Sequence, residues 1–164
     1  MTELFSSDYI TPEFKEKSWI EFRPLNIEDF QKWFCNVLSE LTNCESNEQK
    51  FQEIFNKMYK INTIEPQYFI VVWEDINNWN IAVTWSVIIE NKFIHNWKSV
   101  WHIEDIVVSS KYRGLWLWEH LISILKKIAS KNCYKIILDC DSKNLWFYNK
   151  CWLKEKSLWM AEYF

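Results

Sequence analysis

A single glycine, Gly114, limits what this chain of 164 residues can fold into more than any other feature of its sequence. Glycine supplies backbone conformations with φ > 0 in tight turns, at helix C-termini and where a backbone approaches a ligand closely. At an average usage of about 7%, a chain of this length carries roughly 11 glycines. The sequence has 12 tryptophans, and we interpret many of them as standing where glycine is expected.

The remaining composition is typical of one globular domain. Half of the residues are hydrophobic (49%) and the net charge is −3, which excludes intrinsic disorder and collagen-like repeats. The mild acidity offers no basic stripe for nucleic acid, and no apolar run approaches the ~18 residues of a membrane span. The N-terminus lacks the basic start and apolar run of a signal peptide. We therefore expect a cytoplasmic protein without a nucleic acid or a membrane as partner.

The five cysteines are odd in number and include no Cys-x-x-Cys pair. Disulfide frameworks and zinc sites depend on such paired spacing. We therefore expect free thiols in a reducing compartment and no metal.

Hydrophobic periodicity predicts one mixed α/β domain over residues 19–164, after a loosely attached polar arm at residues 1–18. Strands are predicted, in chain order, over residues 19–24, 68–74, 81–90, 102–109, 134–140 and 160–164. Helices are predicted over residues 26–42, 46–59, 117–131 and 144–150. Asn26 with Asp29, and Ser46 with Gln49, have the spacing of helix-capping pairs. Two further segments, 77–80 and 95–98, have the composition of turns except that each contains a tryptophan.

One short motif lies between a predicted strand and a predicted helix, Arg113-Gly114-Leu115-Trp116-Leu117-Trp118. If Trp116 and Trp118 are read as glycine, it becomes Arg-Gly-x-Gly-x-Gly. A glycine-rich turn at a helix start lets backbone N–H groups approach a phosphate closely, and the helix dipole favours the anion. The alternative is an ordinary helix N-terminus with two packing tryptophans, because one glycine in six residues is a weak motif.

This segment resembles the acetyl-CoA pyrophosphate loop of the GNAT acetyltransferases. Four more segments are similar to the glucosamine-6-phosphate N-acetyltransferase family within that group, namely residues 88–95, 100–108, 133–140 and 144–152. The resemblance covers residues 19–164 and implies that family's fold, a central, mostly antiparallel sheet flanked by helices. The positions at which that family usually has glycine are occupied here by Trp85, Trp101, Trp116, Trp118 and Trp152.

The resemblance implies transfer of acetyl from acetyl-CoA to the amine of D-glucosamine 6-phosphate, a step toward UDP-N-acetylglucosamine, by a homodimer. Three alternatives stay open. The chain could be a GNAT enzyme for another primary amine, a catalytically impaired variant with tryptophan in place of glycine, or a folded binding module. The sequence also leaves open whether the tryptophans are natural, engineered or erroneous.

The resemblance also implies which residues contact acetyl-CoA. The backbone of residues 106–108 is expected to hold the pantetheine, with one amide polarising the thioester carbonyl. Tyr148 matches a tyrosine near the CoA sulfur, and a phenol with a pKa of about 10 is a candidate acid toward the leaving thiolate. Without the resemblance, the alternative interpretation of Tyr148 is a half-buried packing aromatic, and that of Asn144 is an ordinary helix N-cap. The full set expected at the cofactor is Ile106, Val107, Val108, Arg113, Gly114, Leu115, Trp116, Leu117, Trp118, Asn144 and Tyr148.

Three carboxylic acids are expected near the reacting amine. Glu104 and Asp105 are adjacent on a predicted strand, so they should point to opposite faces. Glu104 is the candidate to position the amine or to act as a base through water, and Asp139 matches a family carboxylate near the sugar. Without the resemblance, the alternative interpretation of Glu104 and Asp105 is a solvated acidic pair, and that of Asp139 is a strand-end cap.

A sugar phosphate also requires cations. The family commonly places a phosphate-binding arginine in its last strand, whereas this sequence has Tyr163 there. The full set expected at the substrate, including one contact at the end of the first helix, is Thr42, Lys92, His95, Glu104, Asp105, Lys135 and Asp139.

Overall fold

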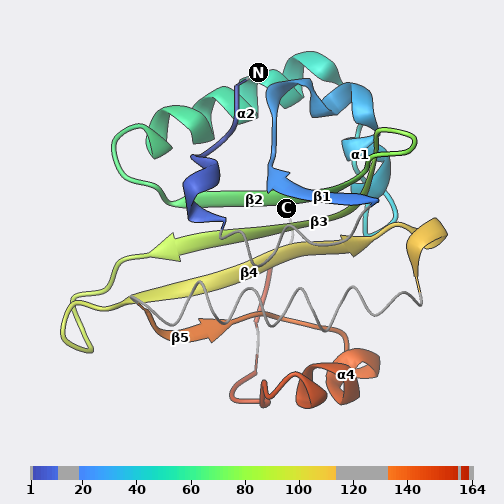
Figure 1. Ribbon diagram of the computed structural model, residues 1–164. Coiled ribbons are helices and arrows are strands. Elements are labelled where there is room, and N and C mark those ends of the chain that lie inside the picture. Colours follow the sequence, from blue (N-terminus) through green and yellow to red (C-terminus); the bar gives the residue numbers. More distant parts are fainter. Residues whose placement is uncertain (1, 11–18, 114–132, 159, 163–164) are drawn as a thin grey trace.

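The computed structural model describes residues 2–10, 19–113, 133–158 and 160–162 (Figure 1). The predicted helix over residues 117–131 lies outside the described residues, as do Gly114, Leu115, Trp116, Leu117, Trp118 and Tyr163. None of the helices that the structure describes has the length and apolar character needed to span a bilayer.

A five-stranded sheet forms the centre of the molecule, with its strands in chain order. Strands β1 to β4 pair antiparallel, whereas β5 pairs parallel with β4, which confirms the expected mixed sheet. Seven of the eight residues of β2 are buried, because both of its faces are covered. The strands are β1 (Ile20–Pro24), β2 (Tyr68–Asp75), β3 (Asn80–Glu90), β4 (Ser99–Val108) and β5 (Cys133–Ile137).

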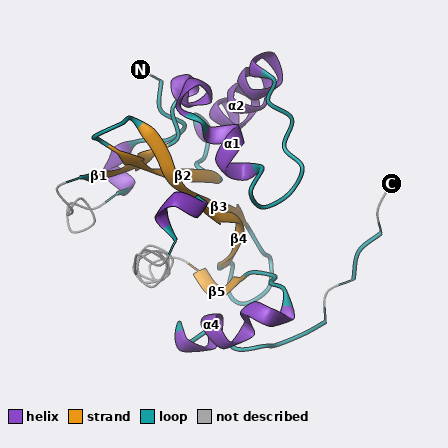
Figure 2. Ribbon diagram, turned by 90° about the vertical axis from the view of Figure 1, so that its right-hand side faces the viewer, coloured by secondary structure: helices purple, strands orange, loops and turns teal. Residues whose placement is uncertain are grey.

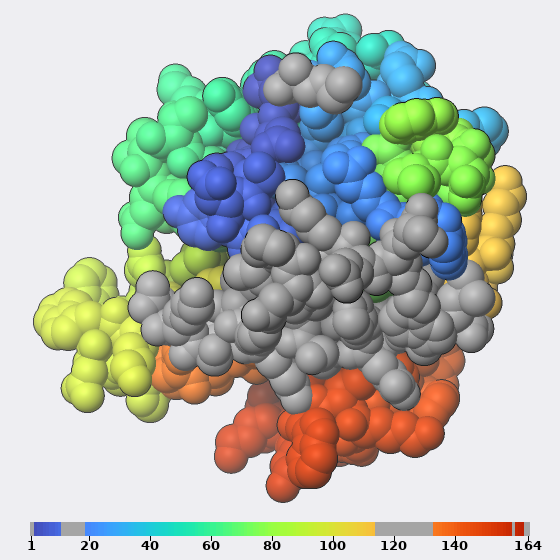
Figure 3. Space-filling view, in the orientation of Figure 1, coloured from blue at the N-terminus to red at the C-terminus, as the bar shows by residue number. Residues whose placement is uncertain are grey.

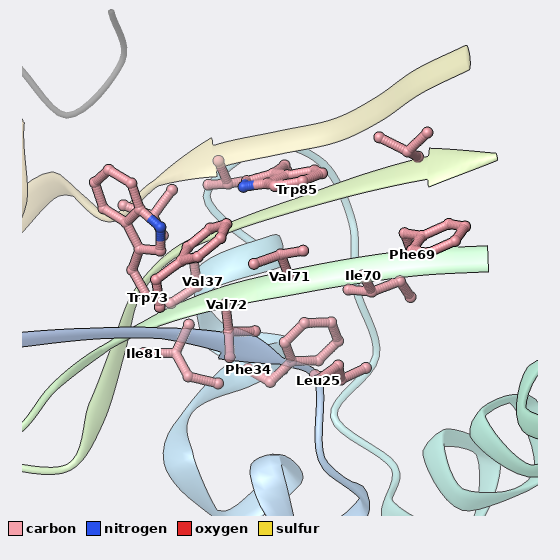
Figure 4. Packing of buried hydrophobic residues seen from close by; sticks show 14 of the residues in the cluster. Leu25, Phe34, Val37, Phe69, Ile70, Val71, Val72, Trp73, Ile81 and Trp85 are labelled. Carbon is pink, nitrogen blue, oxygen red and sulfur yellow. The ribbon is translucent and has the colours of Figure 1, made fainter. Parts of the chain in front are cut away.

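Helices α1 (Phe34–Leu38) and α2 (Glu48–Asn62) lie beside β1–β3, and α4 (Leu145–Lys150) lies beside β5 (Figures 1 and 2). The core forms where α1 meets the sheet, and Phe34 and Val37 of α1 belong to the same cluster of buried side chains as Val71 and Trp85 (Figure 4). Trp85 is 1% exposed, and its ring stacks on Phe22 with centroids 6.1 Å apart.

A buried ion cluster holds β1, β2 and the 3₁₀ helix Ile27–Lys32 together. The guanidinium of Arg23 donates to both carboxyl oxygens of Asp29 at 2.7 Å, and its Nε donates to Glu74 at 2.8 Å. Lys32 Nζ lies 2.6 Å from the other oxygen of Glu74. Both carboxylates are essentially inaccessible to solvent, so removing either cation would leave a buried charge without compensation.

The N-terminal residues differ from the loosely attached arm that the sequence predicts. Leu4, Phe5 and Ile10 are buried, and Leu4 N–H donates to Leu25 O at 2.8 Å. The ring of Phe5 lies 4.9 Å from that of Phe69 on β2. The segment is polar overall, which is why the sequence predicts a loose arm, but its three apolar side chains pack against the sheet.

The helix predicted over residues 26–42 is divided in two. Its capping box is confirmed, because Asn26 and Asp29 exchange the expected side-chain to backbone bonds. The chain then forms a 3₁₀ helix, turns at Trp33 with φ of 68°, and continues as α1.

The other predicted element boundaries also shift. Helix α2 is capped by Asn47, which accepts from Lys50 N–H, rather than by Ser46. Residues 160–162 form no strand, in contrast to the predicted last strand, whose remaining residue placements are not described. A strand requires a partner for its backbone groups, and the described part of this single chain offers none there.

Four tryptophans occupy the left-handed region of backbone conformation. The φ angles of Trp33, Trp79, Trp97 and Trp152 lie between 60° and 68°. This region brings Cβ too close to the following carbonyl oxygen, at a cost of roughly 1–2 kcal/mol for each residue. All four side chains are more than half exposed, so packing does not compensate for the cost. The turns predicted at residues 77–80 and 95–98 are confirmed, and each contains one of these residues.

Trp152 occupies a helix C-terminus at which the backbone conformation favours glycine. Trp152 N–H donates to Asn149 O, and Leu153 N–H donates to Tyr148 O, at 3.0 and 3.1 Å. This pair of bonds ends a helix as a Schellman motif, in which the left-handed residue is usually glycine.

We predict that Trp152→Gly increases the free energy of unfolding by about 1–2 kcal/mol, because it removes the Cβ clash. The melting temperature should rise by about 2–8 °C, measured by thermal denaturation. Trp146→Gly is the matched control, because Trp146 is also exposed but lies inside α4, where glycine costs about 1 kcal/mol. Equal effects of the two substitutions would contradict the prediction.

Candidate active site

The sheet opens between β4 and β5. The two strands pair only over Ser99–His102 of β4, and then diverge (Figure 1). Residues 103–108 of β4 stay paired with β3 on one side but have no strand partner on the other side within the described part of the chain. Their backbone groups can therefore accept and donate hydrogen bonds to an extended ligand, as a sheet edge does for a peptide.

A β-bulge interrupts β4 beside this opening. Glu104 pairs with Ser86 and Val107 with Thr84, so Trp85 alone lies opposite both Asp105 and Ile106. Asp105 adopts φ of 52°. Bulges bend a strand and redirect its side chains. The regular alternation that predicted opposite faces for Glu104 and Asp105 is therefore absent at this point.

Three carboxyl groups interact at the opening. Ile137, the last residue of β5, is level with His102, and Asp139 follows two residues later, near enough for its charge to act on Glu104. Burial raises the pKa of Glu104, and the negative charges of Asp139 and Asp105 raise it further. Burial and the charge of Asp139 likewise raise the pKa of Asp105. A carboxylate with a raised pKa is a stronger base near neutral pH, which suits proton abstraction.

Tyr148 of α4 lies near Asp139, one of these three carboxyl groups. Burial, followed by the nearby Cys140, Cys151 and Asp139, raises the pKa of its phenol to about 12. A thiol has a pKa of about 8.5, so proton transfer from this phenol to a thiolate is uphill by about 5 kcal/mol. Tyr148 is therefore suited to donate a hydrogen bond to a leaving sulfur and poorly suited to transfer its proton. This modifies the role of acid expected from the sequence.

Asn144 precedes α4 in the N-cap position but makes no side-chain capping bond. Its exposed amide is thus not used by the helix. This leaves the side chain available to a ligand that enters from solvent.

The expected cations lie at the other end of the β4–β5 pair. The ring of His95 stacks on Tyr134 at 4.0 Å, and Lys135 Nζ lies 5.7 Å from the centre of the same ring. Lys135 is level with Val100, which is roughly 13 Å along β4 from Glu104. The loop that carries His95 projects from the body of the molecule (Figure 3).

Lys92 and Thr42 are placed differently from this pair. Lys92 forms an ion pair with Glu90, whose second carboxyl oxygen lies 2.9 Å from His102 Nε2. Thr42 is exposed in the turn after α1, where its N–H donates to Leu38 O at 3.3 Å. The structure thus brings His95 and Lys135 together, while the carboxyl cluster lies further along β4 and Thr42 lies in the turn after α1.

Two participants have no signal in the sequence. Tyr134 joins His95 and Lys135 although it stands in an ordinary apolar strand. Glu40 lies 2.9 Å from Arg113 although 73 residues separate them. A contact this distant in sequence follows only from the fold.

The chain is similar to known acetyltransferases in sequence and in fold. Residues 28–151 match the acetyltransferase (GNAT) family. The chain is 41% identical over 145 residues to glucosamine 6-phosphate N-acetyltransferase 1 of Dictyostelium discoideum, covering 88% of this chain and 90% of that relative. It is 38% identical over 146 residues to glucosamine 6-phosphate N-acetyltransferase of Arabidopsis thaliana, covering 88% and 96%. The crystal structure of the glucosamine-6-phosphate N-acetyltransferase from Arabidopsis thaliana superimposes with a TM-score of 0.80 at 37% identity, covering 88% of this chain and 98% of that one.

Proposed function

Because the chain belongs to the acetyltransferase (GNAT) family, we propose that it transfers acetyl from acetyl-CoA to the amine of D-glucosamine 6-phosphate. The products are N-acetyl-D-glucosamine 6-phosphate and CoA. The observation that carries the proposal is the opening between β4 and β5 with its carboxyl cluster, in a chain similar over most of its length to relatives named for this reaction.

The opening fits the extended pantetheine arm of acetyl-CoA. The backbone of Ile106, Val107 and Val108 supplies hydrogen-bonding groups along one wall. Tyr148 and Asn144 would form the opposite wall, and the segment that begins at Arg113 would hold the pyrophosphate. Tryptophan at positions 116 and 118 does not suit that last role, because glycine is the residue that lets a backbone approach phosphate oxygens closely.

The proposed chemistry is direct attack of the neutral amine on the thioester carbonyl carbon. A backbone N–H beside the bulge stabilises the oxyanion. As the C–N bond forms and the C–S bond breaks, the surplus proton on nitrogen passes to Glu104, directly or through a water molecule. Asp139 and Asp105 increase the basicity of Glu104 by charge repulsion, and the Tyr148 hydroxyl donates a hydrogen bond to the departing thiolate.

The sugar phosphate is proposed to bind His95 and Lys135, with Lys92 and Thr42 as further contacts. A homodimer in the cytoplasm completes the proposal. The homodimer is supported by the extended C-terminal segment, which leaves the body of the molecule (Figure 2). Its side chains Leu158 and Met160 are each 91% exposed. A second copy would cover these side chains and pair with their backbone. The alternative substrate is another primary amine, because Tyr163 stands where the family commonly has a phosphate-binding arginine.

We predict that the Trp116→Gly/Trp118→Gly chain acetylates glucosamine 6-phosphate with a higher kcat/KM than glucosamine, a polyamine or a lysine peptide. The measurement is CoA release with each amine at matched concentration. A polyamine or peptide ranking first would contradict the proposed substrate.

The unmodified chain is the control in that experiment. It should bind acetyl-CoA more weakly than the glycine variant in titration calorimetry, because two side chains are removed from the phosphate loop. Micromolar affinity in the unmodified chain would contradict this part of the proposal.

The pH dependence of kcat/KM tests the carboxyl cluster. Activity should fall as pH decreases through the raised pKa of Glu104, since the base must be ionised. Asp139→Asn removes a like charge, lowers that pKa and moves the acidic limb to lower pH. Glu104→Gln should reduce kcat/KM by about 10²–10⁴-fold.

Asp141→Asn is the matched control, because Asp141 is exposed and pairs with Lys143 at 2.9 Å. It should leave the acidic limb in place. A limb that moves equally in both asparagine variants would contradict the assignment to Glu104.

A further inference from the structure

The carboxylate of Glu40 lies where the chain leaves β4 toward Gly114. Its Oε1 accepts a hydrogen bond from Ser109 Oγ at 3.0 Å. Its Oε2 accepts from Ser110 N–H at 2.7 Å and from Arg113 Nη2 at 2.9 Å. One carboxylate thus contacts three of the five residues that join Val108 to the glycine.

Arg113 is held from two directions. Its Nε donates to Val108 O at 3.2 Å, and its Nη2 donates to Glu40. Ser109 is buried and continues the sheet, because its N–H donates to Ala82 O at 2.9 Å. The side chain of Glu40 therefore fastens the turn after α1 to the end of the open strand edge of β4.

We propose that Glu40 is a positioning residue for acetyl-CoA. It fixes the Ser109–Ser110 turn and the Arg113 guanidinium, so that the residues leading into the proposed phosphate-binding segment are ordered before the cofactor arrives. Charge-assisted hydrogen bonds of this kind order a segment before binding and reduce the entropy lost on binding. The proposal rests on the proposed function, because it takes the segment after Arg113 to bind the cofactor.

The test compares Glu40→Ala, Glu40→Gln and Glu45→Ala in the Trp116→Gly/Trp118→Gly chain. Glu40→Ala should increase the Kd for CoA and the KM for acetyl-CoA by about tenfold. Glu40→Gln should lie between, because the amide oxygen still accepts from Ser110 N–H but lacks the charge that holds Arg113. Glu45 is the control, since it pairs with Lys50 on the surface and its removal should change neither constant.

A structural role alone predicts a different result. It would lower kcat and the melting temperature without a selective rise in the KM for acetyl-CoA, and unchanged CoA affinity in Glu40→Ala overturns the proposal. If CoA affinity falls while no amine is acetylated, the positioning role stands and the proposed reaction fails. If the parent variant binds no CoA, both fail.

A second inference rests on the left-handed tryptophans. Seven described residues other than glycine have φ > 0, and four of them are tryptophan. The other three are His95, Asn96 and Asp105, which belong to the residue types that tolerate this conformation. Trp85 and Trp101 add a separate observation, because their buried indole N–H groups meet no acceptor among the described residues.

We infer that the protein acts with glycine at positions 33, 79, 97 and 152, because a codon that yields tryptophan in this sequence is decoded as glycine in the cell of origin. One change of decoding accounts for both the 12 tryptophans and the single glycine. Unrelated substitutions would not select four turns with φ > 0.

The test is peptide sequencing by mass spectrometry of the protein isolated from that cell. Glycine at the four positions is expected, and tryptophan at any of them overturns the inference. A second measurement compares two synthetic chains with four glycines or four alanines there. The glycine chain should melt at a higher temperature, because alanine retains the Cβ clash, and equal melting temperatures also overturn the inference.

Discussion

The site of this protein depends on where the pairing between β4 and β5 stops. Four residues of β4 pair with β5, and the rest of its length keeps only β3 as a neighbour among the described strands. Because β3 holds β4 firmly, the backbone of the open edge is fixed before any ligand arrives. A fixed row of donors and acceptors is what an extended, amide-containing cofactor requires, and the proposed acetyl transfer starts from this geometry.

The bulge at Asp105 adds the chemistry to that edge. It occurs where two residues of β4 oppose Trp85, and it places Glu104 within the electrostatic influence of both Asp105 and Asp139. Repulsion of the half-buried Glu104 carboxylate by Asp105 and Asp139 is unfavourable for stability and favourable for a base. The same opening keeps Tyr148 protonated, so the proposed division of roles follows from burial and charge together.

Side-chain contacts between segments far apart in the sequence hold the strands of the sheet to the surrounding helices and turns. Glu40, at the end of α1, contacts the turn after β4, and Arg23 links β1 to β2 and to the 3₁₀ helix before α1. The Glu40 contacts connect the turn after α1 to the end of the strand that forms the proposed cofactor wall, and the Arg23 contacts hold β1 and β2 to the 3₁₀ helix. Exposed tryptophans at Trp33, Trp79, Trp97 and Trp152 strain the turns between the same elements without contributing core packing.

The sequence by itself determined the chain order of the five described strands and the capping box at Asn26, because local periodicity and motif spacing lie in adjacent residues. The resemblance of its motifs indicated the class of sheet and the family. It also indicated which turns contain tryptophan in place of glycine. Only the tertiary structure decided that the helix breaks at Trp33, that Leu4 and Phe5 belong to the core, and that Glu104 and Asp105 lie at a bulge. It alone brought Asp139 near Glu104 and Glu40 to Arg113, because both contacts depend on packing between segments far apart in the chain.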